Sequence, residues 1–547
     1  MRLTKSFVMG RRAVAVVVAI ATSACIAAVG DGGQRVSADE PPVVATTSGM
    51  LVGVQDPSGT REWRGIPYAA PPVGSLRWRP PQPVAPWTGT RLATEFAQHC
   101  IQPRFGGGTV GSEDCLYLNV FAPPTGTGAG PLPVMVHLHP GGNGFGGAYE
   151  EASSLVERGV IVVSLNYRLG VFGFVGHPAL SAEGSLPEQG LLDQIAALGW
   201  VHDNITNFGG DPGNITLFGM SAGSFDTAAL VASPLTRGMI QRAAIETAAF
   251  WTVTGVGNSL ADKERFGLQT TEQFGCNQSA DITTCLRSIP ASELVEAAGP
   301  IDTQPMVGGI VLPRPVLDVF QQQGASVPLL IGSNREEAVF FLWPLSDPMR
   351  RGEFTRLTTD LLGTTKTAPA LHLYPVADYD SNAWAAVAMF TDAIYTCPTR
   401  RLALAAATRA PTYRYLYTHV MQNDPDQAAV RAAHSFEDPF LWHHFYPLES
   451  GDPYSPTLIE EQLSATMASY WTNFAKRGDP NGAGLPTWPQ YDPTAERYLV
   501  LDDVVGDDAA YHVPQCALMD PVAALFPRCN SLCHYYETAQ WWHKFRD

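Results

Sequence analysis

Charged residues are scarce in this chain, and those present are mostly acidic. They make up 16% of the 547 residues, and 35 lysines and arginines are outnumbered by 52 aspartates and glutamates, which gives a formal net charge of −17. A surface of this sign repels the phosphates of nucleic acids and of anionic lipids, so we expect neither as a partner. The hydrophobic fraction of 45% is that of a globular protein and is sufficient for a large core.

Linkers, repeats and long apolar runs are also missing. No low-complexity segment rich in glycine, serine or proline divides the chain, and no internal repeat is present. We therefore predict one large domain over residues 39–547 with helical insertions. Beyond residue 29 no apolar run is long enough to span a bilayer, so we predict no stable membrane span.

Residues 1–38 have the features of a secretory signal peptide. Four basic residues within the first 12 precede an apolar run over Ala13–Ala21, which is too short for a membrane span. The small residues of Val36–Ala38 form a cleavage site, and Ala28 offers a second one. We therefore predict that the protein is secreted or associated with the cell envelope.

Two other export signals stay open. The pair Arg11 and Arg12 could be a twin-arginine signal, although its flanking residues fit poorly. Cys25 could be a lipoprotein attachment site, although Thr22 stands where an aliphatic residue is usual.

The nine cysteines indicate disulfides rather than a metal centre. Without Cys25 the number is even, which suits an oxidising compartment. The C-x-x-C pairs and neighbouring histidines of a zinc site are missing, so we predict no metal. Three pairs lie close together in the sequence: Cys100 with Cys115, Cys276 with Cys285, and Cys529 with Cys533.

Apolar runs of strand length alternate with helical patterns along the chain. Leu132–His139 and Val160–Arg168 are nearly continuous apolar runs, as in strands that are buried on both faces. Gly190–Ile205 has helical spacing and leads to the next apolar run, which gives the strand–helix–strand order of a parallel sheet. We predict a mixed α/β sheet with helices on both faces, which continues through Arg242–Glu246, Val327–Asn334, Tyr413–Val420 and Tyr498–Leu501.

A G-x-S-x-G pattern stands between one of these strands and a helix. It covers Gly219–Gly223, with Ser221 at the centre. A sharp turn of this kind exposes a serine hydroxyl above the sheet, and side chains at the flanking glycines would collide with the neighbouring strand and helix. The same turn directs the amide of Ala222 to the place where an oxyanion would form.

A glycine-rich loop, Pro140–Gly147, follows the strand that ends at His139. Phosphate-binding loops require G-x-x-x-x-G-K-[ST], or G-x-G-x-x-G at a helix start, and this loop has neither pattern. Its bare amides favour an oxyanion-binding loop instead.

Several blocks of the chain together resemble the type-B carboxylesterases, a family with the α/β-hydrolase fold that includes the cholinesterases. The resemblance runs from about residue 45 to about residue 516. It implies a large, mixed, mostly parallel central sheet with helices on both faces. The matching blocks are Arg64–Gly74, Glu113–Val120, Asn166–Phe174, Gly190–Asn207, Phe208–Gly223 and Trp471–Asn481.

The resemblance implies a catalytic triad of Ser221, Glu337 and His434. The acid lies in a block like Gly-Ser-Asn-Arg-Asp-Glu-Gly, here Gly332–Ala338, and adjacent Glu336 is the alternative. The histidine lies in a block like Ala-x-His-Gly-x-Glu, in which this chain has serine in place of the glycine. The order serine, acid, histidine is that of the α/β-hydrolase topology.

The family's oxyanion loop reads His-Gly-Gly-Gly, and this chain has His139–Gly142 with proline at the second position. The resemblance assigns donation to the two following glycines, so Gly141, Gly142 and Ala222 are the predicted oxyanion hole.

Disulfide pairings and one ion pair are also implied. The pairings are Cys100–Cys115, Cys276–Cys285 and Cys397–Cys516, with Cys529 and Cys533 left as a fourth pair outside the matched region. Arg77 and Glu113 correspond to the family's structural salt bridge.

The implied activity is that of a secreted serine carboxylesterase, which forms an acyl-enzyme from a small-molecule ester and uses no cofactor. A triacylglycerol lipase and a non-catalytic adhesion relative are the alternatives. Choline esters are disfavoured, because residues 101–114 contain no tryptophan for a cation–π contact and Met220 replaces a glutamate. Neither the oligomeric state nor the natural ester follows from the sequence. An apolar pocket could involve Phe145, Phe340, Phe341, Leu342 and Trp343.

Overall fold

The computed structural model describes residues 41–519, except 105, 129, 250–252, 256–257, 299–302, 343–348 and 446–451. The described residues from Pro41 onward belong to one compact unit. The predicted signal peptide and the pair Cys529 and Cys533 lie outside the described residues, so these predictions stay predictions.

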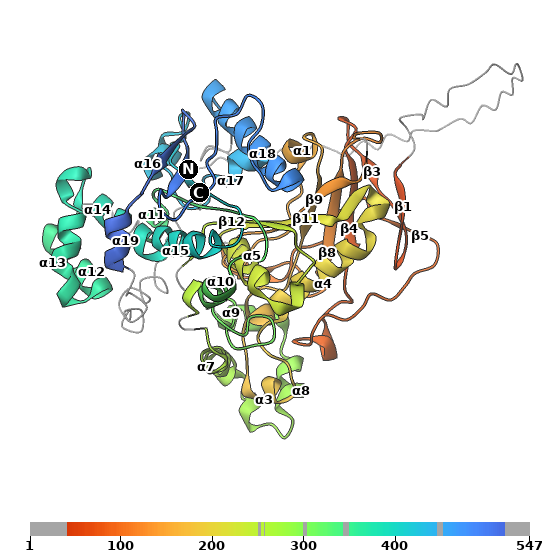
Figure 1. Ribbon diagram of the computed structural model, residues 1–547. Coiled ribbons are helices and arrows are strands. Elements are labelled where there is room, and N and C mark those ends of the chain that lie inside the picture. Colours follow the sequence, from red (N-terminus) through yellow and green to blue (C-terminus); the bar gives the residue numbers. More distant parts are fainter. Residues whose placement is uncertain are drawn as a thin grey trace, which may run out of the picture. The chain divides into compact units, whose positions relative to one another are not determined.

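An 11-stranded mixed sheet runs through this unit (Figure 1). Its order is β16-β15-β14-β13-β12-β11-β9-β10-β8-β4-β3, and all neighbours from β15 to β10 pair in parallel. Antiparallel strands complete both edges. The predicted mixed, mostly parallel sheet is confirmed. Its strands are β3 (Val54–Gln55), β4 (Arg61–Pro67), β8 (Tyr117–Ala122), β9 (Leu132–Leu138), β10 (Ile161–Leu165), β11 (Gly210–Met220), β12 (Arg242–Glu246), β13 (Leu329–Asn334), β14 (Thr412–Tyr417), β15 (Arg497–Leu501) and β16 (Gly506–Ala509).

Two small sheets lie outside it. One has the order β1-β2-β5 and the other pairs β6 with β7. The bounds are β1 (Val43–Thr46), β2 (Gly49–Val52), β5 (Thr90–Leu92), β6 (Gln102–Pro103) and β7 (Thr109–Val110).

Helices cover both faces of the central sheet, because its inner strands are apolar on both faces. Alternate residues of β9 show this: Met135 belongs to one buried cluster, and Val134 and Val136 belong to the other. The first cluster includes residues of α1 (Ser153–Val156), α17 (Asp438–Trp442) and α18 (Leu458–Arg477), and the second includes residues of α4 (Gln189–Asn204), α5 (Ala222–Ala232) and α10 (Val316–Gln323) (Figure 1).

The longest of these helices, α18, has clear sequence signals at both ends. Thr457 and Glu460 form a reciprocal capping box at its start. Lys476 and Arg477 occupy its last turn, and Gly478 ends it in the left-handed region at φ 77°.

The remaining helices gather in the insertions. One group comprises α12 (Arg351–Leu362), α13 (Thr364–Leu373), α14 (Asn382–Thr391) and α19 (Val513–Met519), and another comprises α3 (Pro178–Ala182), α7 (Leu260–Thr271), α8 (Ile282–Ser288) and α9 (Ala291–Ala298) (Figure 1). A π-helix, η8 (Asp392–Thr396), joins α14 to α15 (Cys397–Ala406). Shorter helices are α2 (Gly170–Gly173), α11 (Val339–Leu342), α16 (Pro425–Val430), and the 3₁₀ turns η1 (Gly74–Leu76), η2 (Ile205–Phe208), η3 (Pro234–Thr236), η4 (Glu272–Phe274), η5 (Cys276–Gln278) and η7 (Val376–Asp378).

None of the helices in the described part of the chain combines the length and apolar character that crossing a bilayer requires.

Candidate active site

The turn between β11 and α5 holds Ser221 in a strained conformation. Its backbone has φ 53° and ψ −121°, a region that residues with side chains rarely adopt. A Cβ on Gly223 would lie 1.9 Å from the carbonyl oxygen of Leu138, and one on Gly219 would lie 2.6 Å from the same oxygen. Both flanking glycines are therefore required by the close approach of β9 to this turn.

The imidazole of His434 faces Ser221. Its Nε2 lies 2.7 Å from Ser221 Oγ, although the residues are 213 positions apart. The next residue, Ser435, has φ 75° and contacts Met220 Sδ through Oγ at 3.3 Å. This left-handed backbone explains why glycine is usual there, and the serine keeps the same turn.

Glu337, rather than Glu336, faces the histidine. Glu337 Oε2 lies 2.5 Å from His434 Nδ1, and the side chain is fully buried. Glu336 instead accepts from Arg335 at 2.7 Å and forms an isolated β-bridge with Ala433. That bridge aligns the two segments, so the residues that follow, Glu337 and His434, lie side by side.

Two residues to which the sequence analysis gave no role hold the carboxylate of Glu337. Its Oε1 accepts from the backbone N–H of Asn334 at 2.7 Å and from Thr247 Oγ1 at 2.7 Å. Thr247 follows β12 and has φ 80°, which is a real outlier for a β-branched residue. No local pattern around Thr247 could have indicated this contact, because it joins residues 90 positions apart.

A second buried carboxyl group, Glu437, lies next to this arrangement. Its Oε2 accepts from Asn334 Nδ2, which also donates to the carbonyl of Ala433 at 2.7 Å. Burial raises the pKa of Glu437 well above its usual range, and the nearby charge of Glu337 raises it further. The two buried carboxyl groups thus share Asn334, which donates its backbone N–H to Glu337 and its side-chain amide to Glu437.

The predicted oxyanion donors lie at two neighbouring strand ends. Gly141 and Gly142 follow β9 with φ 115° and 60°, and Ala222 is the first residue of α5. A Cβ on Gly141 would lie 2.1 Å from the carbonyl oxygen of Phe145. No described residue accepts a hydrogen bond from the amides of Gly141, Gly142 or Ala222. These amides are therefore available to an anionic oxygen.

Side chains outside the loop fix its shape. Gln102 receives a hydrogen bond from the Gly146 amide at 2.8 Å and donates one to the Gly146 carbonyl at 2.7 Å. The ring of His139 stacks on Tyr167 at a centroid distance of 4.4 Å, and its Nδ1 faces the Pro140 carbonyl at 2.7 Å. Burial lowers the pKa of His139 to about 4. The ring is therefore neutral near pH 7 and adds no positive charge to the loop.

The apolar residues that could line a pocket have different positions. Leu342 is buried in the core, and Phe340 is half-buried against Phe436 at a centroid distance of 5.7 Å. Trp343 and the side chain of Phe341 lie outside the described residues. The half-buried Phe145 follows the oxyanion loop.

An aromatic ring from the insertion lies beside the triad. Tyr395, in the π-helix η8, has its ring centroid 5.5 Å from that of His434. A π-helix contains an extra residue per turn and often marks a functional site.

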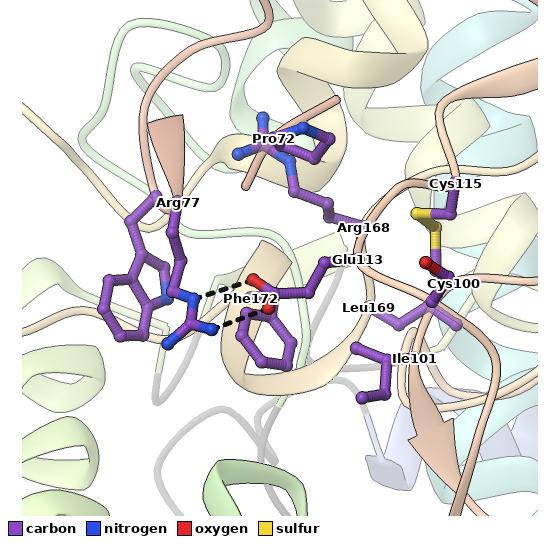
Figure 2. A pocket seen from close by; sticks show the side chains of 11 residues that line it. Pro72, Arg77, Cys100, Ile101, Glu113, Cys115, Arg168, Leu169 and Phe172 are labelled. Carbon is purple, nitrogen blue, oxygen red and sulfur yellow. Dashed lines mark hydrogen bonds and ion pairs between the residues drawn. A yellow bond between two sulfur atoms is a disulfide. The ribbon is translucent and has the colours of Figure 1, made fainter. Parts of the chain in front are cut away.

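The described part of the chain contains three disulfides, with the pairings that the family resemblance implied. They join Cys100 to Cys115, Cys276 to Cys285, and Cys397 to Cys516. The first lies beside a pocket that contains neither the triad nor the oxyanion residues (Figure 2). In that pocket Glu113 accepts two hydrogen bonds from Arg77, at 2.7 and 2.6 Å, so the pair has the geometry of a structural salt bridge.

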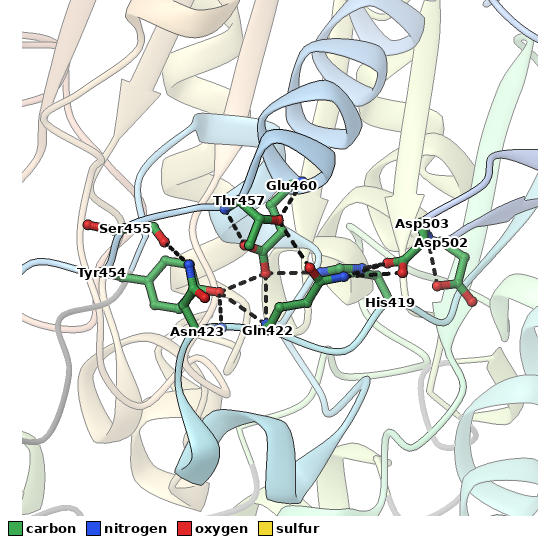
Figure 3. A network of polar contacts seen from close by, with 9 residues as sticks. All are labelled: His419, Gln422, Asn423, Tyr454, Ser455, Thr457, Glu460, Asp502 and Asp503. Carbon is green, nitrogen blue, oxygen red and sulfur yellow. Dashed lines mark hydrogen bonds and ion pairs between the residues drawn. The ribbon is translucent and has the colours of Figure 1, made fainter.

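One group of side chains in the described part of the chain has the spacing of a metal site. The ligand atoms of His419, Asp502 and Asp503 lie within 4.8 Å of one another. Each is already engaged. Asp503 faces His419 Nδ1 at 2.8 Å (Figure 3). Asp502 accepts a hydrogen bond from Thr418 Oγ1 at 2.6 Å. The other ring nitrogen of His419 faces Glu460 at 3.2 Å. This network ties α18 to the loop after β15.

Comparison with known proteins gives consistent matches over nearly the whole described chain. A model of the carboxylesterase family matches residues 40–518. The chain is 34% identical to a para-nitrobenzyl esterase of Bacillus subtilis (strain 168) over 485 residues, which cover 85% of this chain and 95% of that protein. It is 36% identical to a fumonisin B1 esterase of Sphingopyxis macrogoltabida over 493 residues, which cover 84% of this chain and 86% of that protein. A solved PNB esterase structure superposes with a TM-score of 0.74 and 32% identity, over 87% of this chain and 99% of that chain.

Proposed function

This chain belongs to the carboxylesterase family and is a carboxylic ester hydrolase, and on that basis we propose that it is a secreted serine esterase with a Ser221–His434–Glu337 triad. The observation that supports the triad is the continuous line of contacts from Ser221 Oγ to His434 and on to Glu337, at 2.7 and 2.5 Å. This is the geometry of a nucleophile, a general base and an orienting carboxylate.

In the first half of the reaction His434 Nε2 takes the proton of Ser221 as Oγ attacks the ester carbonyl. Glu337 accepts from Nδ1–H, which fixes the tautomer and stabilises the imidazolium. Collapse of the tetrahedral intermediate expels the alcohol, which receives the proton from His434. In the second half His434 takes a proton from water, which attacks the acyl-enzyme. The second intermediate then collapses, Ser221 Oγ leaves and regains the proton from His434, and the acid is released.

The negative charge of each intermediate falls on the former carbonyl oxygen. We assign its stabilisation to the amides of Gly141, Gly142 and Ala222, which have no acceptor among the described residues. Removing one such donor typically reduces kcat by about 100- to 1000-fold.

The proposed substrates are soluble esters with short to medium acyl chains. The names of two relatives, a para-nitrobenzyl esterase and a fumonisin B1 esterase, support an ester substrate without fixing which one. Triacylglycerol lipase is the second candidate, and a non-catalytic relative is disfavoured because all three triad residues are present.

Secretion is supported by the three disulfides, since such bonds persist in oxidising compartments. N-terminal sequencing of exported protein tests it: a mature chain beginning at Asp39 agrees with cleavage after Ala38. A product that retains residues 1–38 contradicts it.

An acyl-chain series tests the enzymatic proposal. Wild type and Ser221→Ala are compared on 4-nitrophenyl esters of increasing acyl length and on an emulsified long-chain triglyceride. We expect preferred turnover of the short soluble esters and a loss of roughly a millionfold in kcat for the variant. Preference for the emulsion would indicate a lipase, and substantial activity in folded Ser221→Ala would exclude Ser221 as the nucleophile.

A further inference from the structure

A buried carboxyl group that the mechanism above does not use lies behind the oxyanion loop. Asp226 is the fifth residue of α5, and its side chain is fully buried. Its Oδ1 accepts from Asn143 Nδ2 at 2.9 Å, and its Oδ2 accepts from Gln194 Nε2 at 2.5 Å. Asp226 therefore connects the helix that follows the nucleophile with the loop that carries Gly141 and Gly142.

Asn143 is the contact point on that loop. It follows Gly142 directly, is fully buried, and has φ 57°. Its Nδ2 also donates to the Thr303 carbonyl at 3.2 Å, and its Oδ1 lies 2.9 Å from the Tyr167 hydroxyl. Both ends of the amide are thus held, which fixes the side chain in one orientation.

The segment Gly141–Asn143 depends on these contacts, because the amides of its two glycines do not anchor it. No described residue accepts from the N–H groups of Gly141 or Gly142. This segment is held instead from its carbonyl groups and from the Asn143 side chain: the Gly142 carbonyl accepts from Thr303 Oγ1, and the Asn143 carbonyl accepts from Gly170 N–H at 2.7 Å. Among these anchors, Asp226 alone comes from the helix that begins at the oxyanion donor Ala222.

We propose that Asp226 is a positioning residue for ester hydrolysis, which acts through Asn143 to fix the direction of the Gly141 and Gly142 amides relative to Ala222. The inference rests on the proposed function of Ser221 and of these three amides. Asp226 touches no reacting atom. Its effect comes from joining the two segments that supply the oxyanion donors, because a donor that points away from the oxyanion contributes little.

The arrangement predicts which replacements are tolerated. Gln194 Oε1 has no hydrogen-bond partner among the described residues. In Asp226→Asn the new amide oxygen can still accept from Asn143, and its N–H can donate to Gln194 Oε1 once that amide turns over. Asp226→Ala removes both contacts and leaves Asn143 Nδ2 with the Thr303 carbonyl alone.

The experiment measures kcat, KM and the inhibition constant of a trifluoromethyl ketone, whose adduct with the serine carries an oxyanion. Asp226→Ala, Asn143→Ala, the double variant and Asp226→Asn are compared with wild type on a short 4-nitrophenyl ester. Each rate is divided by the concentration of active sites, measured by titration of the reactive serine. Thr227→Val is the matched control, because it removes a buried hydroxyl from the next position of the same helix, where it donates to the Gly223 carbonyl.

We expect kcat to fall roughly tenfold in each alanine variant, a fraction of the effect of deleting a whole donor. KM stays within about twofold, and the ketone inhibition constant rises in the same ratio as kcat falls. The double variant is no worse than the poorer single variant, since both changes break one connection. Asp226→Asn and Thr227→Val stay within about threefold of wild type.

The inference is overturned if the rate per titrated serine and the ketone inhibition constant are unchanged in both alanine variants, because Asp226 then serves folding alone. If Asp226→Ala does not fold, Asn143→Ala and Asp226→Ser decide by the same two measurements. If Ser221→Ala loses ester hydrolysis while Asp226→Ala keeps the wild-type rate, this inference is refuted and the proposed triad is unaffected. A wild type without ester turnover would refute the proposed function itself.

Discussion

Thr247 Oγ1 donates a hydrogen bond to Glu337 Oε1 at 2.7 Å, from a backbone with φ 80°. A β-branched residue in this region is strained by about 1–3 kcal/mol. Two hydrogen bonds to the backbone of Thr247 hold it in this conformation. Its amide donates to the Gly332 carbonyl at 3.0 Å, and its carbonyl accepts from the Ser224 hydroxyl. The strain is thus located at the contact that orients the carboxylate of Glu337.

Thr247→Val keeps the shape of the side chain and removes the donor. Because a hydrogen bond to a charged group contributes about 1.5–3 kcal/mol, we expect kcat to fall roughly tenfold or more with little change in KM. The measurement is steady-state hydrolysis of a short soluble ester. Thr399→Val is the control, since Thr399 is buried nearby and contacts Ala248 instead. Equal effects of the two substitutions would contradict a specific role for Thr247.

The two adjacent glutamates are separated by a paired substitution. Glu337→Gln loses the charge that faces His434 Nδ1, and we expect kcat to fall by about 10⁴-fold, as for comparable triad acids. Glu336→Gln affects only the contacts with Arg335 and the Ala432 amide, so its kcat stays within tenfold of wild type. Active-site titration normalises both rates. The assignment is wrong if Glu336→Gln is the more damaged enzyme.

Motifs could indicate the proposed triad because two of its blocks are tied to a local backbone shape. The glycines beside Ser221 are required by the approach of β9, and Ser435 occupies a left-handed turn. The mixed parallel sheet was predictable for a similar reason, since continuous apolar runs require burial on both faces.

The supporting groups could not be predicted, because they join distant segments. Thr247 and Glu337 are 90 residues apart, and Asn143 and Asp226 are 83 apart. No periodicity or turn pattern encodes such a pair. Only the tertiary arrangement shows that buried Glu437 lies beside the triad acid.

The disulfides differ in the length of chain that they close. Cys397 and Cys516 are 119 residues apart, and Cys276 and Cys285 are 9 apart. Loop-closure entropy predicts that replacing both cysteines of a pair by serine lowers the free energy of unfolding by roughly 5 kcal/mol for the long loop and roughly 2.5 kcal/mol for the short one.

Denaturant unfolding of the two double variants under non-reducing conditions measures the difference. A larger loss for the short loop would show that local packing, rather than chain entropy, dominates. The hydrolysis rate provides a second readout, because Cys397 directly follows the π-helix that carries Tyr395.

Stability should also depend on pH through Glu246. Burial raises the pKa of this carboxyl from 4.5 to about 8. The hydrogen bond that it accepts from Trp471 Nε1 lowers the pKa, but by less than burial raises it. The folded protein therefore binds the proton more tightly than the unfolded chain does. This stabilising contribution is complete below pH 4.5 and is lost as the pH rises through 8.

The glutamine in Glu246→Gln cannot ionise. The free energy of unfolding of the variant should therefore increase relative to that of wild type as the pH rises from 5 to 8. The gain approaches about 1.4 kcal/mol per pH unit at most. Unfolding curves at several pH values measure it, and exposed Glu157→Gln supplies the assay baseline. A constant difference between Glu246→Gln and wild type would rule out the expected protonation.

The π-helix η8 allows the surroundings of His434 to be altered by a deletion of one residue. Because each helical residue advances the backbone by about 100°, deleting one residue between Asp392 and Thr396 would rewind the segment as an ordinary helix. Tyr395 would then swing away from the imidazole of His434. A single-codon deletion would thus move the ring that lies beside His434 without replacing any residue of the proposed triad.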